Sequence, residues 1–271
     1  MNKVVLIVFA VVLLLPLYFL AIGSLTDAVG IFTMPPRLLP REPSLDNYGY
    51  FLGLGLGRWA TNSAVLVVAA ALCSVTVSCI TGYAFAFFKF PFKRWLWLLL
   101  LAGIMVPRMS MMIPSFIVLR KLGLLNTLAG LALSRMLSPA GMYLARAYFE
   151  TVPTSLLDAA RIDGASDFQV LSRVVVPISK PIVTCLALFA GVGALGDYVW
   201  QSLVLQTRDK HTLIIGLLRS VAADKVLTPE LSVNQLGREF AASMLLSIPV
   251  LLVFFVASRY FVSALGGALK E

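Results

Sequence analysis

The sequence predicts an all-α membrane protein with six transmembrane helices and one structured loop on the cytoplasmic side. Of its 271 residues, 59% are hydrophobic and only 13% are charged, whereas a typical soluble domain has about 45–50% apolar and about 25% charged residues. Several apolar runs reach the roughly 20 residues that a helix needs to cross a bilayer. Each run is expected to be helical, because a helix satisfies its own backbone hydrogen bonds in lipid.

The six predicted spans are separated by short stretches that contain proline, glycine or charge. They cover residues 4–25, 59–88, 95–119, 122–145, 181–207 and 240–258. The first run resembles a signal peptide, but it exceeds the usual apolar core of about 7–15 residues and contains Pro16, so we expect it to be retained as a span. Pro139 and Gly141 interrupt the fourth run, which makes its ends the least defined.

The positive charge of the chain indicates membrane topology and not nucleic-acid binding. The net charge is +9, but the basic residues are scattered between apolar runs and never form one patch. The loop 89–94, KFPFKR, concentrates three cations and is therefore expected in the cytoplasm. With six spans, both termini and the connection between the fourth and fifth spans are then cytoplasmic too.

Two further connections are expected on the side of the membrane opposite to the cytoplasm. Residues 27–58 are rich in proline and glycine and predict an irregular external cap. Residues 208–238 predict a second external loop, in which His211, the single histidine, is expected to be solvated. The three cysteines lie inside apolar runs and have no metal-ligand spacing, so we interpret them as packing residues and expect no metal site.

One charged segment interrupts the apolar pattern between the fourth and fifth spans. Residues 156–181 read LLDAARIDGASDFQVLSRVVVPISKP and predict a helix, a turn and a second helix. A first helix is expected to begin near Pro153, with Ser155 and Asp158 at capping-box spacing, and to stop at Gly164, which tolerates a left-handed backbone. Ser166 and Gln169 predict a second capping box. A second helix would follow and end at Pro177, before Pro181 opens the next span.

A structured loop of this length suggests a function, because connections in compact proteins are commonly shorter. One interpretation is a helix adsorbed on the bilayer surface. Such helices usually have a strongly basic polar face, whereas residues 158–173 contain three acids and two bases. The small residues Ala159, Ala160, Gly164 and Ala165 would instead let another protein approach the backbone closely. We therefore favour docking of a cytoplasmic partner.

The charged segment closely resembles the cytoplasmic EAA loop, written roughly E-A-A-x-x-x-G, of permease subunits of bacterial binding-protein-dependent ABC importers. Its version, DAARIDGAS, is similar to the carbohydrate branch and to its maltose-system type. Further stretches resemble the same family over nearly the whole chain. They are PLYFLAIGSLTD, PSLDNYGYF, NSAVLVVAAALCSVTVSCITGYAFAFFKF and IPSFIVLRKLGLLNTLAGLAL.

This resemblance implies the type I ABC importer permease fold and a place in the inner (plasma) membrane. It implies three kinds of protein partner: a second, homologous permease subunit, a dimer of ATPase subunits and an extracytoplasmic solute-binding protein. The coupling helix would enter a cleft on the ATPase through Asp158, Ala159, Ala160, Asp163, Gly164 and Ala165. No cofactor is expected on this chain, which has no G-x-x-x-x-G-K-[ST] phosphate loop, so ATP and Mg²⁺ would be handled by the ATPase.

The domain division expected on this basis has three parts. Residues 1–58 hold the first span and external loop, 59–260 form the transporter domain with its coupling loop at about 150–180, and 261–271 form a short cytoplasmic tail. The sequence departs from the family pattern in having Asp158 where glutamate is usual, which shortens that carboxylate by one methylene. It also has LGDYVWQ at 195–201 where the family often has Trp-Asn, which bears on substrate choice.

Three charged residues fall inside predicted spans, where ionised side chains are expensive and usually face the protein interior or a water-filled cavity. Arg108, Arg135 and Asp197, with the neighbouring Tyr198 and Trp200, are therefore candidates for the substrate pathway. A structural pairing of Asp197 with an arginine is the alternative. If both arginines line the path, the transported sugar or oligosaccharide could be acidic. The methionine-rich stretch 105–112 is interpreted as adaptable packing at the permease interface.

Two other classes of function compete with the transporter. A membrane-embedded transferase would need catalytic groups clustered near one interface, but the chain has one histidine and no paired carboxylates in a shared loop. A scaffold would explain the spans but not the capped helical loop. We therefore expect a permease subunit that delivers a carbohydrate by alternating access and is not itself an enzyme.

Overall fold

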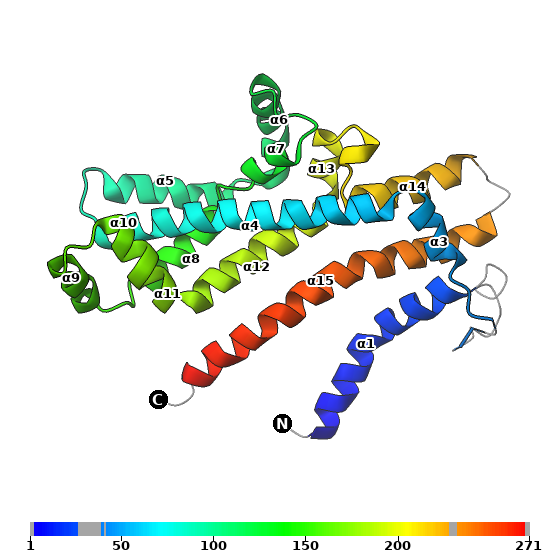
Figure 1. Ribbon diagram of the computed structural model, residues 1–271, viewed down its shortest axis with the longest axis horizontal. Coiled ribbons are helices and arrows are strands. Elements are labelled where there is room, and N and C mark those ends of the chain that lie inside the picture. Colours follow the sequence, from blue (N-terminus) through cyan, green and yellow to red (C-terminus); the bar gives the residue numbers. More distant parts are fainter. Residues whose placement is uncertain (1–2, 27–38, 41, 228–231, 269–271) are drawn as a thin grey trace. The chain divides into compact units, whose positions relative to one another are not determined.

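The computed structural model describes residues 3–26, 39–40, 42–227 and 232–268, and its regular secondary structure in these residues is helical (Figure 1). Of residues 224–227, 232–234 and 256–268 only the backbone is described. The helices divide into two compact units. Unit 1 comprises residues 1–63 and 211–251, and unit 2 comprises residues 64–210 and 252–271.

Unit 1 contains α1 (Lys3–Leu25), α3 (Asp46–Gly53), the start of α4 (Leu56–Phe87), α14 (Leu213–Leu227) and most of α15 (Ser232–Ala268). Its core gathers aromatic and aliphatic side chains from α3, α4, α14 and α15. Trp59 is 2% exposed, and Gly216 of α14 lies so close to its indole that a Cβ there would collide with the ring. The core residues are Phe51, Trp59, Leu213, Leu217, Val221, Ala241 and Ala242.

The expectation that residues 27–58 form an irregular cap is wrong for their C-terminal part. Residues 46–53 form the two-turn helix α3, with Asp46 in the first turn, where a negative charge is favourable. The buried ring of Phe51 anchors this helix in the core of unit 1, so tertiary packing outweighs the local glycine content. Residues 27–38 and 41 of the predicted cap lie outside the described residues.

The expectation for His211 is also wrong. His211 is only 6% exposed, and its Nε2 lies 3.1 Å from Arg219 Nη1 of α14. Its carbonyl oxygen accepts a hydrogen bond of 2.8 Å from Asn62, and the next turn is held by Ser63, whose hydroxyl accepts from the Leu213 amide. Residues 208–227 are thus not an open loop but lead into the 15-residue helix α14.

Unit 2 holds the remainder of α4 and a series of shorter helices. In order these are α5 (Lys93–Met105), η1 (Arg108–Met111), α6 (Met112–Lys121), α7 (Leu128–Leu133), α8 (Pro139–Phe149), α9 (Thr154–Ile162), α10 (Asp167–Val170), the π-helical η2 (Leu171–Val175), α11 (Val176–Ile178), α12 (Lys180–Gly196), α13 (Tyr198–Val204) and η3 (Arg208–Lys210). Their core consists of Cys79, Tyr83, Ala145, Phe149, Val152, Leu157, Val170, Leu171, Val175 and Leu186.

Three helices are long and apolar enough to cross a membrane in the described part of the chain. They lie at Lys3–Leu25, Leu56–Phe87 and Gln235–Phe255, close to the first, second and sixth predicted spans. Two helix pairs also qualify if each is one broken span: Lys93–Met105 with Arg108–Lys121, bent by 103°, and Asp167–Ile178 with Lys180–Gly196, bent by 88°. The structure therefore provides three to five candidate spans.

The third and fourth predicted spans are not the continuous helices that the sequence suggested. The third breaks at Val106, which is extended because Pro107 disfavours a helical residue before it. The fourth is divided into α7 and α8, with residues 134–138 between them. Ser138 caps α8 by accepting a hydrogen bond from the Gly141 amide, and Pro139 takes the first turn. Local capping thus outweighs the apolar composition.

Candidate functional site

Two features of unit 2 contain the predicted functional residues: the charged segment, whose helices lie between residues 154 and 178, and a cavity lined by other helices of this unit. The charged segment begins with α9. Its C-terminal turn is closed by two backbone hydrogen bonds of 3.0 Å, from the Ala165 amide to the Ala160 carbonyl and from the Gly164 amide to the Arg161 carbonyl. Gly164 has φ +82°, as the sequence predicted. This Schellman closure fixes where α9 ends and how the chain turns toward α10.

The second predicted capping box is confirmed, and the first is wrong. The Gln169 amide donates to Ser166 Oγ at 3.4 Å, and the Ser166 amide donates to Gln169 Oε1 at 2.8 Å. Helix α9 begins at Thr154, after Pro153, as predicted, but it has no side-chain cap. Asp158 is directed to Arg161, 3.6 Å away, one turn along the same helix. The Asp158 carboxylate thus pairs with a side chain within α9 and does not cap the start of this helix.

Asp167 connects the two helices of the charged segment to α4. Its Oδ1 accepts a hydrogen bond of 3.0 Å from Arg161 Nη2, and the Tyr83 hydroxyl lies 3.5 Å from the same oxygen. The hydrogen bond to the Asp167 carboxylate also raises the pKa of the Arg161 guanidinium. No sequence signal pointed to Tyr83, because it lies 84 positions away from its partner in the chain.

The two faces of α9 differ in their surroundings. Leu157 is 1% exposed and lies in the core of unit 2, whereas Ile162 is 86% exposed. Phe168, at the start of α10, is 71% exposed. Among the predicted docking residues, Asp158, Ala159, Asp163 and Gly164 are exposed, while Ala160 and Ala165 are half-buried and pack against the core. The exposed face therefore combines acidic and small residues with two large apolar side chains, Ile162 and Phe168, that the predicted docking set did not include.

The second helix of the charged segment was expected to end at Pro177, but it does not end there. It continues through the π-helical turn η2 and α11 to Ile178. Proline lacks an amide hydrogen and its ring collides with the carbonyl four residues earlier, and a wider π-turn accommodates both effects. The chain then bends by 88° into α12. Figure 1 shows the charged segment at the end of unit 2 where α4 ends and α5 begins.

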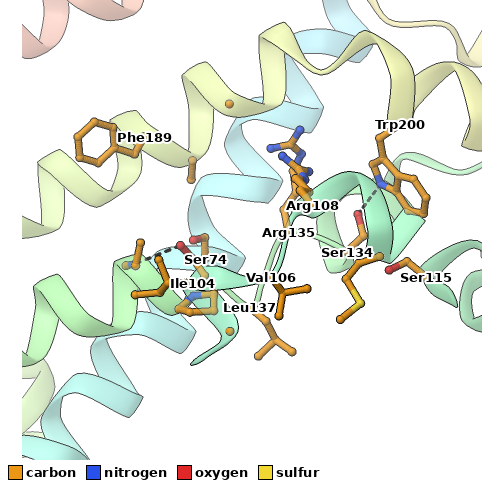
Figure 2. Close-up of a pocket in the computed structure, with 18 of the residues that line it drawn as sticks. Ser74, Ile104, Val106, Arg108, Ser115, Ser134, Arg135, Leu137, Phe189 and Trp200 are labelled. Carbon is orange, nitrogen blue, oxygen red and sulfur yellow. Dashed lines mark hydrogen bonds between the residues drawn. The ribbon is translucent and has the colours of Figure 1, made fainter. Parts of the chain in front are cut away.

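The cavity of unit 2 has a volume of about 640 Å³ and is lined by residues of α4, α5, η1, α6, α8, α12 and α13 and of the stretch 134–138 between α7 and α8. Arg108 and Arg135 are the charged residues of its lining (Figure 2). The rest of the lining mixes hydroxyl groups with apolar and aromatic surfaces. Those that the argument below uses are Ser74, Ser115, Ser138, Phe189 and Trp200.

The two arginines share one carboxylate. Asp197 Oδ2 lies 2.8 Å from Arg108 Nη2 and 2.5 Å from Arg135 Nη2. The Arg135 side chain is 8% exposed and the Asp197 side chain 14%, whereas the Arg108 side chain is 57% exposed. The pairing that the sequence left open as an alternative is therefore present, and it involves both predicted arginines.

Asp197 and its neighbours also organise α13. The other carboxylate oxygen, Oδ1, accepts a hydrogen bond of 3.3 Å from the Trp200 amide and caps this helix. The Trp200 indole donates to Ser134 Oγ at 2.9 Å, and Figure 2 shows this bond beside the arginine pair. Trp200 lines the cavity, but Tyr198 does not appear in its lining. Of the methionine-rich stretch, Met111 and Met112 line the cavity, while Met105 and Met109 are 85% and 71% exposed.

Comparisons with known proteins agree with this arrangement. The family model described as "Binding-protein-dependent transport system inner membrane component" matches residues 74–266. The arabinooligosaccharides transport system permease protein AraQ of Halalkalibacterium halodurans is 30% identical over 228 residues, which cover 83% of this chain and 79% of that protein. The sn-glycerol-3-phosphate transport system permease protein UgpE of Brucella abortus is 29% identical over 272 residues, which cover 97% of this chain and 94% of that protein.

Two more comparisons extend the range. The galactooligosaccharides transport system permease protein GanQ of Bacillus subtilis is 30% identical over 269 residues, covering 94% of this chain and 89% of that protein. A chain in the crystal structure of a bacterial ABC transporter involved in the import of the acidic polysaccharide alginate superimposes with a TM-score of 0.81, at 24% identity, over 96% of this chain and 95% of that chain. The last likeness bears on the fold.

Proposed function

This chain belongs to the family of binding-protein-dependent transport system inner membrane components, and from this premise we propose that it moves a sugar or oligosaccharide through the membrane by alternating access. It is the permease of an ABC importer, a multi-pass protein of the inner membrane, and not itself an enzyme. A solute-binding protein and an ATPase are its partners. The carbohydrate class is supported by the relatives for arabino- and galactooligosaccharides.

The full assembly in this proposal contains a second, homologous permease and two ATPase subunits. ATP and Mg²⁺ are bound and used by the ATPase subunits, and this chain holds no cofactor. The proposed topology has six spans, with α7 and α8 together supplying the fourth, and both termini in the cytoplasm. The cationic loop 89–94 supports this orientation, since it lies at the same end of unit 2 as the charged segment (Figure 1).

The coupling role of the charged segment rests on one observation: α9 is rigidly closed at its end and tied by Asp167 to α10 and α4. A helix that transmits motion must keep its orientation while its partner moves. We assign contact with the ATPase to Asp158, Ala159, Asp163 and Gly164, which are exposed, and to Ile162 and Phe168 beside them. Ala160 and Ala165 complete the predicted coupling set from its inner side, where they hold α9 against the core.

The substrate pathway is proposed to pass through the cavity of unit 2. Hydroxyl groups of the lining serines suit the hydroxyls of a sugar, and the flat faces of Phe189 and Trp200 suit its rings. Arg108 and Arg135 line this cavity, and both form ion pairs with Asp197. Tyr198 is the residue that follows Asp197 in the chain. Binding sites of this kind are mostly apolar, with a few polar groups that fix orientation.

The test is transport by the complete complex in proteoliposomes, with the binding protein on one side and ATP on the other. A panel of arabino-, galacto- and uronate oligosaccharides and glycerol 3-phosphate is offered, and uptake and ATP hydrolysis are measured together. We expect at least one carbohydrate to stimulate ATP hydrolysis and to be taken up. Hydrolysis stimulated equally by a complex that lacks this chain would contradict its role as an essential permease.

A further inference from the structure

We propose that Arg108 binds an acidic group of the transported solute, a carboxylate or a phosphate, and that Asp197 occupies this guanidinium while the cavity is empty. This inference rests on the proposed transport function and names the substrate class for the same cavity. It is carried by the unequal environments of two arginines that share one carboxylate.

The charges of the cavity do not balance. Arg108 and Arg135 both lie within 2.8 Å of the same oxygen of Asp197, and the lining of the cavity contains no acidic residue among those that the structure describes. Two cations and one anion leave a single positive charge in a membrane-spanning unit. Because an uncompensated charge is costly there, an anion that enters the cavity is favoured.

The two arginines have different freedom to meet such an anion. Arg135 is 8% exposed, and Gly193 of α12 lies so near that a Cβ there would be 3.3 Å from its Nη1. Its Nε is buried and has no hydrogen-bond partner. Arg108 is 57% exposed. A solute can therefore reach Arg108 directly, while Arg135 remains with Asp197.

The exchange leaves no carboxylate unpaired. When Arg108 turns to the solute, Asp197 keeps Arg135 on Oδ2 and the Trp200 amide on Oδ1. Arg108 gives up its ion pair with Asp197 and gains charge-assisted hydrogen bonds to the solute, so binding is favoured. A guanidinium presents its donors in a planar fork that fits both carboxylate and phosphate oxygens. Asp197 thus acts as an internal stand-in for the acidic group of the solute.

The experiment compares acidic and neutral solutes with the complete complex in proteoliposomes. The solutes are an oligouronate, a neutral oligosaccharide of the same length, and glycerol 3-phosphate, so that carboxylate and phosphate are distinguished. Arg108→Gln and Arg108→Lys are tested beside Arg120→Gln, a control that removes an exposed arginine of α6 outside the cavity lining. Co-purification of the subunits checks assembly, and the affinity of the binding protein, a separate chain, is measured in parallel.

We expect uptake of one acidic solute to fall about tenfold or more in Arg108→Gln, because a charge-assisted hydrogen bond is lost. Arg108→Lys should keep part of the uptake, and Arg120→Gln should match the wild type. Asp197→Asn retains a capping oxygen for Trp200 and removes the competing charge, so the half-saturating concentration of the acidic solute should fall severalfold.

Two results would overturn the inference. One is transport of the acidic solute by Arg108→Gln at the wild-type rate with assembly intact. The other is uptake confined to the neutral oligosaccharide, which would leave the proposed carbohydrate import standing and remove only the acidic substrate class. Uptake of glycerol 3-phosphate alone would contradict carbohydrate import but keep the acidic substrate class, whereas a wild-type complex that takes up none of these solutes would overturn both.

Discussion

Arg161 at the end of α9 donates a hydrogen bond of 3.0 Å to Asp167, the first residue of α10. This bond spans the turn at Gly164 and sets the angle between the two helices of the charged segment. Because the Tyr83 hydroxyl lies 3.5 Å from the same oxygen of Asp167, α9 is also connected to the end of α4. A partner that moves α9 therefore acts on α4 through a defined polar contact.

The first prediction concerns this contact. Asp167→Asn removes the charge that holds Arg161 and should lower uptake per ATP hydrolysed severalfold. Both side chains are about half exposed, and exposed ion pairs contribute only about 0.2–1 kcal/mol to folding, so thermal unfolding should change little. Glu150→Gln is the control, since it breaks the exposed Arg146–Glu150 pair nearby. An unchanged ratio of uptake to hydrolysis in Asp167→Asn would rule out a coupling role.

The second prediction concerns the end of α9. Gly164→Ala places a side chain at φ +82°, which costs about 1–2 kcal/mol in a left-handed conformation. No atom lies within 4 Å of the new Cβ, so the effect comes from the backbone alone. We expect weaker co-purification with the ATPase. Gly196→Ala, where the space is equally open and φ is not positive, should assemble normally; equal behaviour of the two variants would contradict the prediction.

The third prediction separates docking from folding on α9. Ile162 is 86% exposed, so Ile162→Asp should leave unfolding of the isolated permease unchanged and reduce ATPase binding at least tenfold, as loss of an apolar contact at an interface does. Leu157→Ala, at a 1% exposed site, should instead cost about 2–5 kcal/mol of folding free energy. Calorimetry and co-purification distinguish these outcomes, and full ATPase binding by Ile162→Asp would place the interface elsewhere.

The fourth prediction concerns Asn126, which joins the turn after α6 to the turn after α13. Its Oδ1 accepts hydrogen bonds of 3.1–3.2 Å from the Gln206 amide and from the amide and hydroxyl of Thr207, and its φ is +59°. Asn126→Ala loses these bonds and strains the backbone, whereas Asn126→Gly loses only the bonds. Ala should therefore be less stable than Gly by about 1 kcal/mol.

Thermal unfolding of the purified complex measures this difference. Asn126→Asp is the matched control, since its carboxylate still offers an oxygen to the same three donors, and it should remain close to the wild type. Equal stability of the Ala and Gly variants would show that the positive φ at residue 126 carries no strain.

Local signals made the charged segment largely predictable from sequence. Gly164 and the pair Ser166–Gln169 act over a few residues, and both were found where the pattern placed them. The first and second spans were predicted nearly to their ends, because a long apolar run has no competing local signal. Asp158 failed as a capping residue because Arg161, one turn away, offered it a charged partner.

Contacts between distant parts of the chain were harder to predict from the sequence. Hydropathy gives no bend angle, so the 103° break between α5 and η1 could not be predicted even though Pro107 marked its position. The partners of His211 and of Tyr83 lie on other helices, where a single sequence contains no sign of them. The sequence did indicate Arg108, Arg135 and Asp197, since charges in apolar runs must find one another or water, but not that all three would meet at one oxygen.

The 88° bend between α11 and α12 gives the permease a lever. Helix α12 has 17 residues, which at 1.5 Å per residue makes an arm of about 25 Å. Rotation of the charged segment by about 10° would swing the far end of this arm by about 4 Å. Asp197 follows directly at that end, so such a rotation would displace the carboxylate that both arginines share.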